Sequence, residues 1–230
     1  MSNISFRIAG VSIVAILAGI GPVASAMNQA PTAMAPVVSP GDPGTQPATP
    51  ALGETIAAEA QRQATERDRT AMDAEAARLR PGQFAWHPER SATGPVEIVV
   101  SIAAQKAYVY RGGKLIAATT VSTGRAGHRT PTGSFRILEK QRTHFSRKYD
   151  NAPMPNMQRL TMDGIALHAG NLPGYAASHG CVRLPMEFSR LLFGVTSVGN
   201  RVHIVAGAPH AASDALAFAT GSAPVQMAAR

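Results

Sequence analysis

The 230-residue chain has little of what several classes of functional site require. It carries one cysteine, Cys181, so it cannot close an internal disulfide and lacks the paired cysteines of common zinc sites. Aromatic residues make up 5% of the chain, and no recognisable nucleic-acid motif is present, so nucleic acid is not an expected partner. The apolar run at residues 8–20 is shorter than the roughly 20 residues that a membrane-spanning helix needs.

Both ends of the chain have compositions that differ from its middle. Residues 1–26 look like an export signal peptide: Arg7 precedes the apolar run, and the small residues of 24–26 (ASA) are typical of a cleavage site. Residues 27–53 are rich in proline and are expected to form a disordered linker, and residues 208–230 an alanine-rich disordered tail. We therefore expect export to the periplasm or cell wall, with membrane contact only through the signal segment if it stays uncleaved.

Residues 54–80 are expected to form a helix. They are rich in Ala, Glu, Gln and Arg, and the segment stops at a Pro-Gly pair at residues 81–82. The apolar face is thin, with only Ile56, Met72 and Leu79 beyond alanine. This composition favours a stalk or a loosely docked helix, and a partner-binding helix is the alternative.

From residue 96 the apolar pattern acquires the period of two that is typical of strands. A hairpin with a Gly-Gly turn is predicted around residues 112–113, and one short helix at residues 185–193 with proline at its start. Strands are expected at residues 96–102, 107–110, 115–122, 134–139, 158–161, 165–168 and 201–205. These elements predict one mainly β domain over residues 93–207.

The predicted domain is strongly basic. Residues 91–207 hold 14 lysines and arginines against five acidic residues, a net charge of +9, whereas the whole chain carries +8. Such a charge favours an anionic partner, and for an exported protein an acidic polymer of the cell envelope is the best candidate. The alternative is that the charge serves only solubility.

The residues around the single cysteine suggest nucleophilic catalysis. Cys181 lies in the segment SHGCVR at residues 178–183, and His168 ends the apolar segment GIAL at residues 164–167. A cysteine acts as its thiolate, and a nearby imidazole is the usual proton acceptor. Because Gly180 has no Cβ, a substrate carbonyl could approach the amides of Gly180 and Cys181, which would then serve as oxyanion donors.

Other chemistries fit the sequence less well. His168, His179 and Cys181 could each bind a metal, but their spacing follows no usual zinc pattern. The few carboxylates of the domain are scattered, which disfavours glycosidase chemistry. No metal and no organic cofactor are expected, and the sequence leaves open whether His168 or His179 is the base.

Two motifs give the domain a specific resemblance. HAG at residues 168–170 followed by SHGCVRL at residues 178–184 resembles the signature of the bacterial L,D-transpeptidase catalytic domain, the cysteine enzymes that crosslink peptidoglycan. STG at residues 122–124 and TPTGSF at residues 130–135 are similar to the strand and turn that precede the active site in this family. The likeness extends over residues 95–206 and includes NAPMP at residues 151–155, in a loop that overhangs the site in relatives.

The resemblance implies a β-sandwich with the active site in a cleft beneath this loop. Cys181 would be the nucleophile and His168 the proton acceptor and donor, with Ser178, His179 and Gly180 shaping the nucleophile's turn. Substrate contacts are expected from Arg183, Tyr175, Gly170 and Met154. The segment between His168 and Cys181 is shorter than in many family members, which leaves acceptor specificity open.

The resemblance also implies a reaction. The Cys181 thiolate would attack the diaminopimelate carbonyl of a peptidoglycan stem tetrapeptide, release the terminal D-alanine and form a thioester. An amine of a second stem peptide or a lysine of an envelope protein would then accept the acyl group. Water as acceptor would make the protein an L,D-carboxypeptidase or hydrolase, and a non-catalytic peptidoglycan-binding module is the alternative from another class.

Overall fold

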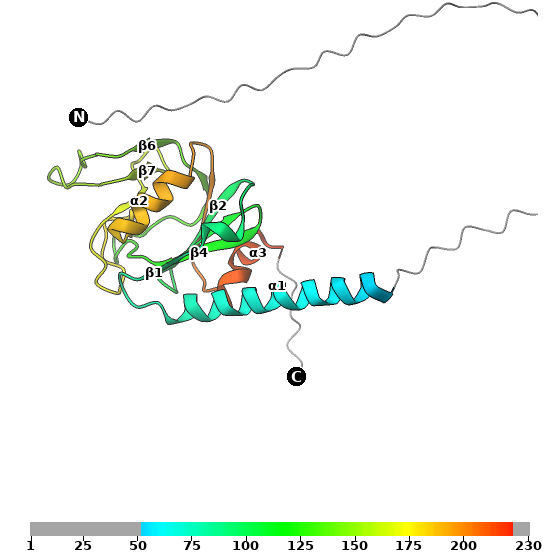
Figure 1. The fold of residues 1–230 in the computed structure, drawn as a ribbon. Coiled ribbons are helices and arrows are strands. Elements are labelled where there is room, and N and C mark those ends of the chain that lie inside the picture. The colour runs from blue at the N-terminus through cyan, green and yellow to red at the C-terminus, as the bar shows by residue number, and fades with distance from the viewer. Residues whose placement is uncertain (1–51, 223–230) are drawn as a thin grey trace, which may run out of the picture. The chain divides into compact units, whose positions relative to one another are not determined.

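The computed structural model describes residues 52–222, which form two β-sheets and three α-helices (Figure 1). The first sheet has the strand order β1-β4-β3-β2-β10-β5, with β1 (Phe84–Trp86), β2 (Val96–Ser101), β3 (Lys106–Arg111), β4 (Lys114–Thr120), β5 (Gly133–Arg136) and β10 (Arg201–Val205). The second has the order β6-β7-β8-β9, with β6 (Glu139–Gln141), β7 (Met157–Arg159), β8 (Ala166–Ala169) and β9 (Val182–Leu184). The helices are α1 (Leu52–Arg78), α2 (Met186–Val195) and α3 (Ala215–Thr220).

The predicted export signal at residues 1–26 lies outside the described residues, as does all of the predicted linker at residues 27–53 except its last two. Within residues 52–222, no helix combines the length and the apolar character needed to cross a membrane.

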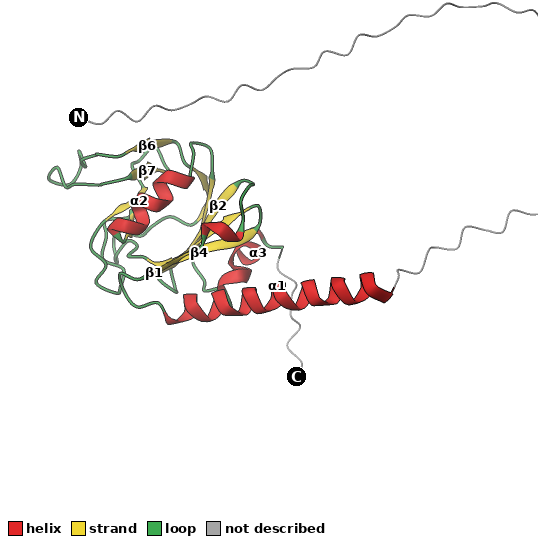
Figure 2. Ribbon diagram, in the orientation of Figure 1, coloured by secondary structure: helices red, strands yellow, loops and turns green. Residues whose placement is uncertain are grey.

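The two sheets bury their facing sides against each other and against α2. Alternate residues of β2, such as Ile98 and Val100, share one apolar cluster with Leu167 of β8 and Val182 of β9. Phe188 of α2 completes this core, with the rings of Phe84 and Trp86 5.5 and 5.6 Å from its own. Because the strands have the period of two that the sequence shows, one face of each enters the core. The expected mainly β sandwich is confirmed (Figure 2).

The opposite face of the six-stranded sheet is covered by helices. Val99, Tyr108 and Tyr110 on this face pack with Met72 and Ala76 of α1, both of which are 2% exposed. The C-terminal half of α1 is therefore firmly docked, whereas residues 53–67 are all exposed. The expected stalk or loosely docked helix is therefore wrong for the second half of α1, and it stays a prediction for residues 53–67.

The predicted disordered tail is wrong for residues 208–222. These residues form a 3₁₀ turn at Ala212–Asp214 followed by α3. The Tyr110 hydroxyl donates to the carbonyl oxygen of Ala212 and accepts from the amide of Leu216 at 3.1 Å, and burial raises the Tyr110 pKa. The small alanine side chains let α3 approach the sheet closely, and Ala215 is fully buried.

Asp73 should hold the C-terminal segment on the domain. Its two carboxylate oxygens accept hydrogen bonds of 2.7 Å from the amide and the hydroxyl of Ser213. Hydrogen bonds to a charged group contribute about 1.5–3 kcal/mol, so Asp73→Ala should lower the free energy of unfolding by about that amount. Urea denaturation measures the loss, and hydrogen exchange should speed up over residues 212–220. Glu54→Ala, on the exposed end of α1, is the control, and equal effects of both variants would contradict this role of Asp73.

Candidate active site

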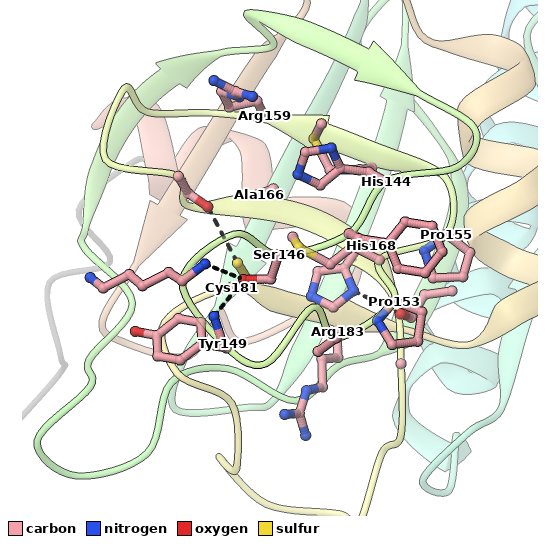
Figure 3. Close-up of a pocket in the computed structure, with 18 of the residues that line it drawn as sticks. His144, Ser146, Tyr149, Pro153, Pro155, Arg159, Ala166, His168, Cys181 and Arg183 are labelled. Atoms are coloured by element: carbon pink, nitrogen blue, oxygen red, sulfur yellow. Dashed lines mark hydrogen bonds between the residues drawn. The ribbon is translucent and has the colours of Figure 1, made fainter.

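The pairing of β8 with β9 brings the candidate catalytic residues together. The two strands are parallel, with Leu167 opposite Val182 and His168 opposite Arg183. Successive side chains of a strand point to opposite faces, so the burial of Leu167 and Val182 in the core turns His168 to the other face. Cys181, which precedes Val182, lies on that same outer face. Both side chains line one cavity, as Figure 3 shows.

The cavity has a volume of about 1110 Å³ and lies beneath a lid formed by residues 142–156. The lid folds back on itself: the amide of Met154 donates to the carbonyl of His144 at 2.8 Å, and Asn156 to Arg142 at 2.9 Å. The side-chain amide of Asn156 also donates to the Ser189 hydroxyl of α2 at 2.9 Å. The segment NAPMP at residues 151–155 thus belongs to a lid that is attached to α2 through Asn156.

A tight turn presents Cys181. Gly180 has φ +120°, a conformation that favours glycine, and a Cβ there would lie 2.8 Å from Cδ1 of Ile165. The Ser178 hydroxyl accepts from the Gly180 amide at 3.0 Å and donates to the Cys181 carbonyl. Thr130, a residue that the sequence analysis did not single out for a role, donates to the Gly180 carbonyl at 2.8 Å.

These contacts correct one sequence-based expectation. Because the Gly180 amide is engaged by the Ser178 hydroxyl, Gly180 is not an oxyanion donor in this geometry. Of the two amides considered, that of Cys181 is left as the candidate donor. Ser178 and Gly180 act on the shape of the turn.

Cys181 is half-buried in apolar surroundings. It packs against Met154, Met157 and Ala166, and its thiol donates a weak hydrogen bond to the Gly164 carbonyl at 3.6 Å. Burial raises the pKa of the thiol above its ordinary value, while the Ala166 amide and the Arg183 charge act in the opposite direction. Cys181 is therefore mainly a neutral thiol at pH 7.

His168 is held as a neutral imidazole. Its Nδ1 lies 2.7 Å from the carbonyl oxygen of Ala169, which can only accept, so the ring hydrogen is on Nδ1 and Nε2 is free to accept a proton. Burial lowers the pKa of His168 to about 4, the Ala169 hydrogen bond opposes this, and the charges of Arg183 and His144 lower it further. At pH 7 His168 is thus uncharged, with the protonation state of a base.

His179 has a different environment. Its ring stacks on Tyr149 of the lid at 4.5 Å between centroids and meets His128 edge-on at 5.0 Å. Burial, and then the charges of Arg125, His128 and Arg183, lower its pKa. No hydrogen bond within the described residues fixes its tautomer, so the geometry favours His168 over His179 as the base.

The four expected substrate contacts are placed differently. Arg183, Gly170 and Met154 line the cavity, and a Cβ on Gly170 would lie 2.9 Å from Cγ of Arg183, so glycine leaves room for that side chain. Tyr175 is 65% exposed and lies outside the lining, so its expected place in the cleft is wrong. Its backbone carbonyl accepts from the Ser122 hydroxyl at 2.7 Å instead.

Tyr149, Met157 and Met162 also line the cavity, although the sequence did not indicate them. No sequence signal could have found Tyr149, because its partner His179 lies 30 positions away and is reached only by folding of the lid. Between residues 52 and 222, no three His, Cys, Asp or Glu side chains are grouped to hold a metal ion.

Comparison with known proteins points to one family. Residues 95–204 match the family model YkuD, the L,D-transpeptidase catalytic domain. L,D-transpeptidase 1 of Mycobacterium tuberculosis is 28% identical over 123 residues, which is 46% of this chain and 49% of that protein. The chain thus spans about half the length of the curated relatives it matches.

Solved structures of L,D-transpeptidases are also similar to the chain. One from Stackebrandtia nassauensis is 30% identical with a TM-score of 0.46, covering 50% of this chain and 57% of its own. One from Mycobacterium smegmatis is 23% identical with a TM-score of 0.46, covering 49% and 59%. The family model thus identifies residues 95–204, just under half of the chain, as similar to the L,D-transpeptidase catalytic domain.

Replacement of Gly180 tests the turn that presents the nucleophile. Gly180→Ala should lower the free energy of unfolding by about 2–4 kcal/mol, because both the positive φ and the clash with Ile165 oppose a side chain. Gly127→Ala is a matched control, since Gly127 has φ +81° with nothing within 4 Å, and should cost only about 1–2 kcal/mol. Thermal or urea denaturation measures both losses of free energy of unfolding. Equal losses for the two variants would show that the contact with Ile165 does not destabilise Gly180→Ala.

The protonation states predict how Cys181 reacts with a neutral alkylating agent. The raised thiol pKa means that the thiolate is depleted at pH 7, so the iodoacetamide rate should rise steadily from pH 6 to above pH 9. His168 is uncharged above about pH 4, so His168→Gln should leave this profile nearly unchanged. The alkylation rate is measured by mass spectrometry of samples quenched at successive times. A plateau between pH 5 and 8 that His168→Gln removes would show a thiolate–imidazolium pair and contradict the assignment.

Proposed function

We propose that the protein is a peptidoglycan L,D-transpeptidase with Cys181 as nucleophile. The observation that carries the proposal is the β8–β9 register, which places a thiol and a neutral imidazole on one wall of a lidded cavity. The similarity of residues 95–204 to the L,D-transpeptidase catalytic domain supports this activity. The donor is the stem tetrapeptide, attacked at the carbonyl of diaminopimelate.

In the first half-reaction, Nε2 of His168 takes the thiol proton as the Cys181 sulfur bonds to the carbonyl carbon. The Cys181 amide stabilises the resulting oxyanion. The imidazolium then returns the proton to the nitrogen of D-alanine, which leaves as the amine, and a thioester remains. Because burial lowers the pKa of His168 to about 4, its protonated form is a strong acid toward this leaving nitrogen.

In the second half-reaction an amine attacks the thioester and gives its proton to His168. The carbon–sulfur bond breaks, and the thiolate recovers a proton from the imidazolium. The raised pKa of Cys181 favours this return to the neutral thiol. An amine of a second stem peptide gives a crosslink, a lysine of an envelope protein gives attachment, and water gives an L,D-carboxypeptidase.

We further propose that the protein works outside the cytoplasmic membrane, in the periplasm or cell wall. The signal-like sequence of residues 1–26 supports export, and the proposed substrate polymer is external. The catalytic domain would be separated from the signal-like segment by the proline-rich residues 27–53 and by the exposed first half of α1.

Defined tetrapeptide muropeptides test the reaction. The full chain should release D-alanine and yield crosslinked dimers, as read by mass spectrometry, and Cys181→Ala should form neither thioester nor product. Met162→Leu, a conservative change at an 84% exposed lining residue, should keep activity within about threefold.

The products also separate the alternatives. Trimmed tripeptides without dimers would identify a hydrolase, and binding without any product would identify a peptidoglycan-binding module. Release of D-alanine by Cys181→Ala at the wild-type rate would contradict the proposed nucleophile.

A further inference from the structure

Four basic residues lie in or beside the lining of the cavity, and we call them the cationic rim: Arg125, Arg147, Lys148 and Arg183. Arg147 and Lys148 come from the lid and Arg183 from β9, and all three line the cavity. Arg125 follows β4 and is anchored beside the nucleophile's turn, where its amide donates to the Ser178 carbonyl at 3.0 Å. The residues of the rim therefore come from three separate parts of the chain: the segment after β4, the lid and β9.

Three of the four rim residues, namely Arg125, Lys148 and Arg183, lie near His179. The ammonium of Lys148 lies 5.6 Å from the centre of the Tyr149 ring, which stacks on His179 at 4.5 Å. Burial is the main cause that lowers the pKa of His179, and the nearby charges of Arg125 and Arg183 act in the same direction. His179 is two residues from Cys181, and the Arg183 charge also acts on the Cys181 thiol.

Within residues 52–222, none of the four rim cations forms a salt bridge, which distinguishes them from several other cations of the domain. Arg159, on the same cavity, pairs with Glu139 at 2.8 Å, and Arg190 pairs with Glu187. Unpaired cations gathered at the mouth of a cleft create a positive potential that attracts and orients an anionic ligand. A carboxylate-bearing peptide fits this surface, because arginine binds carboxylates through two parallel hydrogen bonds.

We propose that the cationic rim recognises free carboxylates of the donor stem peptide, so that the enzyme prefers donors with carboxylates to donors in which these groups are carboxamides. This inference rests on the proposed function and adds a specificity to it. A stem peptide carries such groups on glutamate and on diaminopimelate, close to the bond that is cleaved. Amidation keeps their shape but removes the charge, so it removes the attraction of the rim.

The experiment compares two tetrapeptide donors that differ only in having carboxylates or carboxamides on glutamate and diaminopimelate. The readout is kcat/KM for D-alanine release by the full chain. Wild type should prefer the carboxylate donor by on the order of tenfold, and 0.5 M salt should reduce this preference because exposed charges are screened.

Neutral substitutions then locate the preference. Arg125→Gln, Arg147→Gln and Lys148→Gln should each lower kcat/KM about two- to fivefold for the carboxylate donor, the range for an exposed charge pair, and leave the carboxamide donor nearly unchanged. Arg201→Gln is the matched control, since Arg201 is an exposed cation on β10 that does not line the cavity. It should change neither donor.

The alkylation rate of Cys181 by iodoacetamide, measured on each variant, shows whether the nucleophile is intact. Equal turnover of the two donors by wild type would overturn the rim's role and leave the transpeptidase proposal standing. Equal losses for both donors in the rim variants would overturn it as well. If neither donor reacted while alkylation was normal, the proposed function itself would fail.

Discussion

The parallel pairing of β8 with β9 is the constraint on which the rest of the site depends. In this register Leu167 and Val182 enter the core, so the residues beside them face the cavity. A slip of one residue would exchange the two faces and bury the catalytic side chains. The segment that follows β4 also holds β9 in place, because Ser122 and Arg183 exchange backbone hydrogen bonds of 3.1 and 3.0 Å. The hydrophobic core thus determines where the chemistry lies.

Burial in this cavity shifts the pKa values of Cys181 and His168 in opposite directions, and both shifts favour the uncharged form of the group. It raises the pKa of the thiol and lowers that of the imidazole, so both groups are neutral in the resting site. In the proposed reaction, charge would then develop only as the proton moves during attack, where the backbone amide of Cys181 would stabilise the oxyanion. The nearby Arg183 charge favours the thiolate and disfavours the imidazolium, so it lowers the pKa of both groups.

Much of the fold could be predicted from the sequence, since β2, β3, β4 and β10 are short runs rich in apolar residues that are bounded by turns, as is typical of strands buried on both faces. The three-residue strands β1 and β9 are too short to show a period and take their conformation from their neighbours. The docking of residues 208–222 depends on the Tyr110 hydroxyl and on tightly packed alanines, which composition does not reveal.

The same limit applies to the site. The motif around Cys181 and the strand end at His168 were visible in the sequence, because their chemistry belongs to the residue types. Three other features were not visible in the sequence, because each depends on how the chain folds around the site. They are the hydrogen bond from the Gly180 amide to Ser178, the position of Tyr175 outside the cavity and the stacking of Tyr149 on His179.

The most direct measurement of the central claim is peptide mapping of the acyl-enzyme after acid quenching of the full chain mixed with tetrapeptide. The account predicts a tripeptidyl adduct on Cys181 that accumulates much more slowly when His168 is replaced by glutamine, while His179→Gln forms it at close to the wild-type rate. An adduct on another residue, or an undiminished rate without His168, would contradict it.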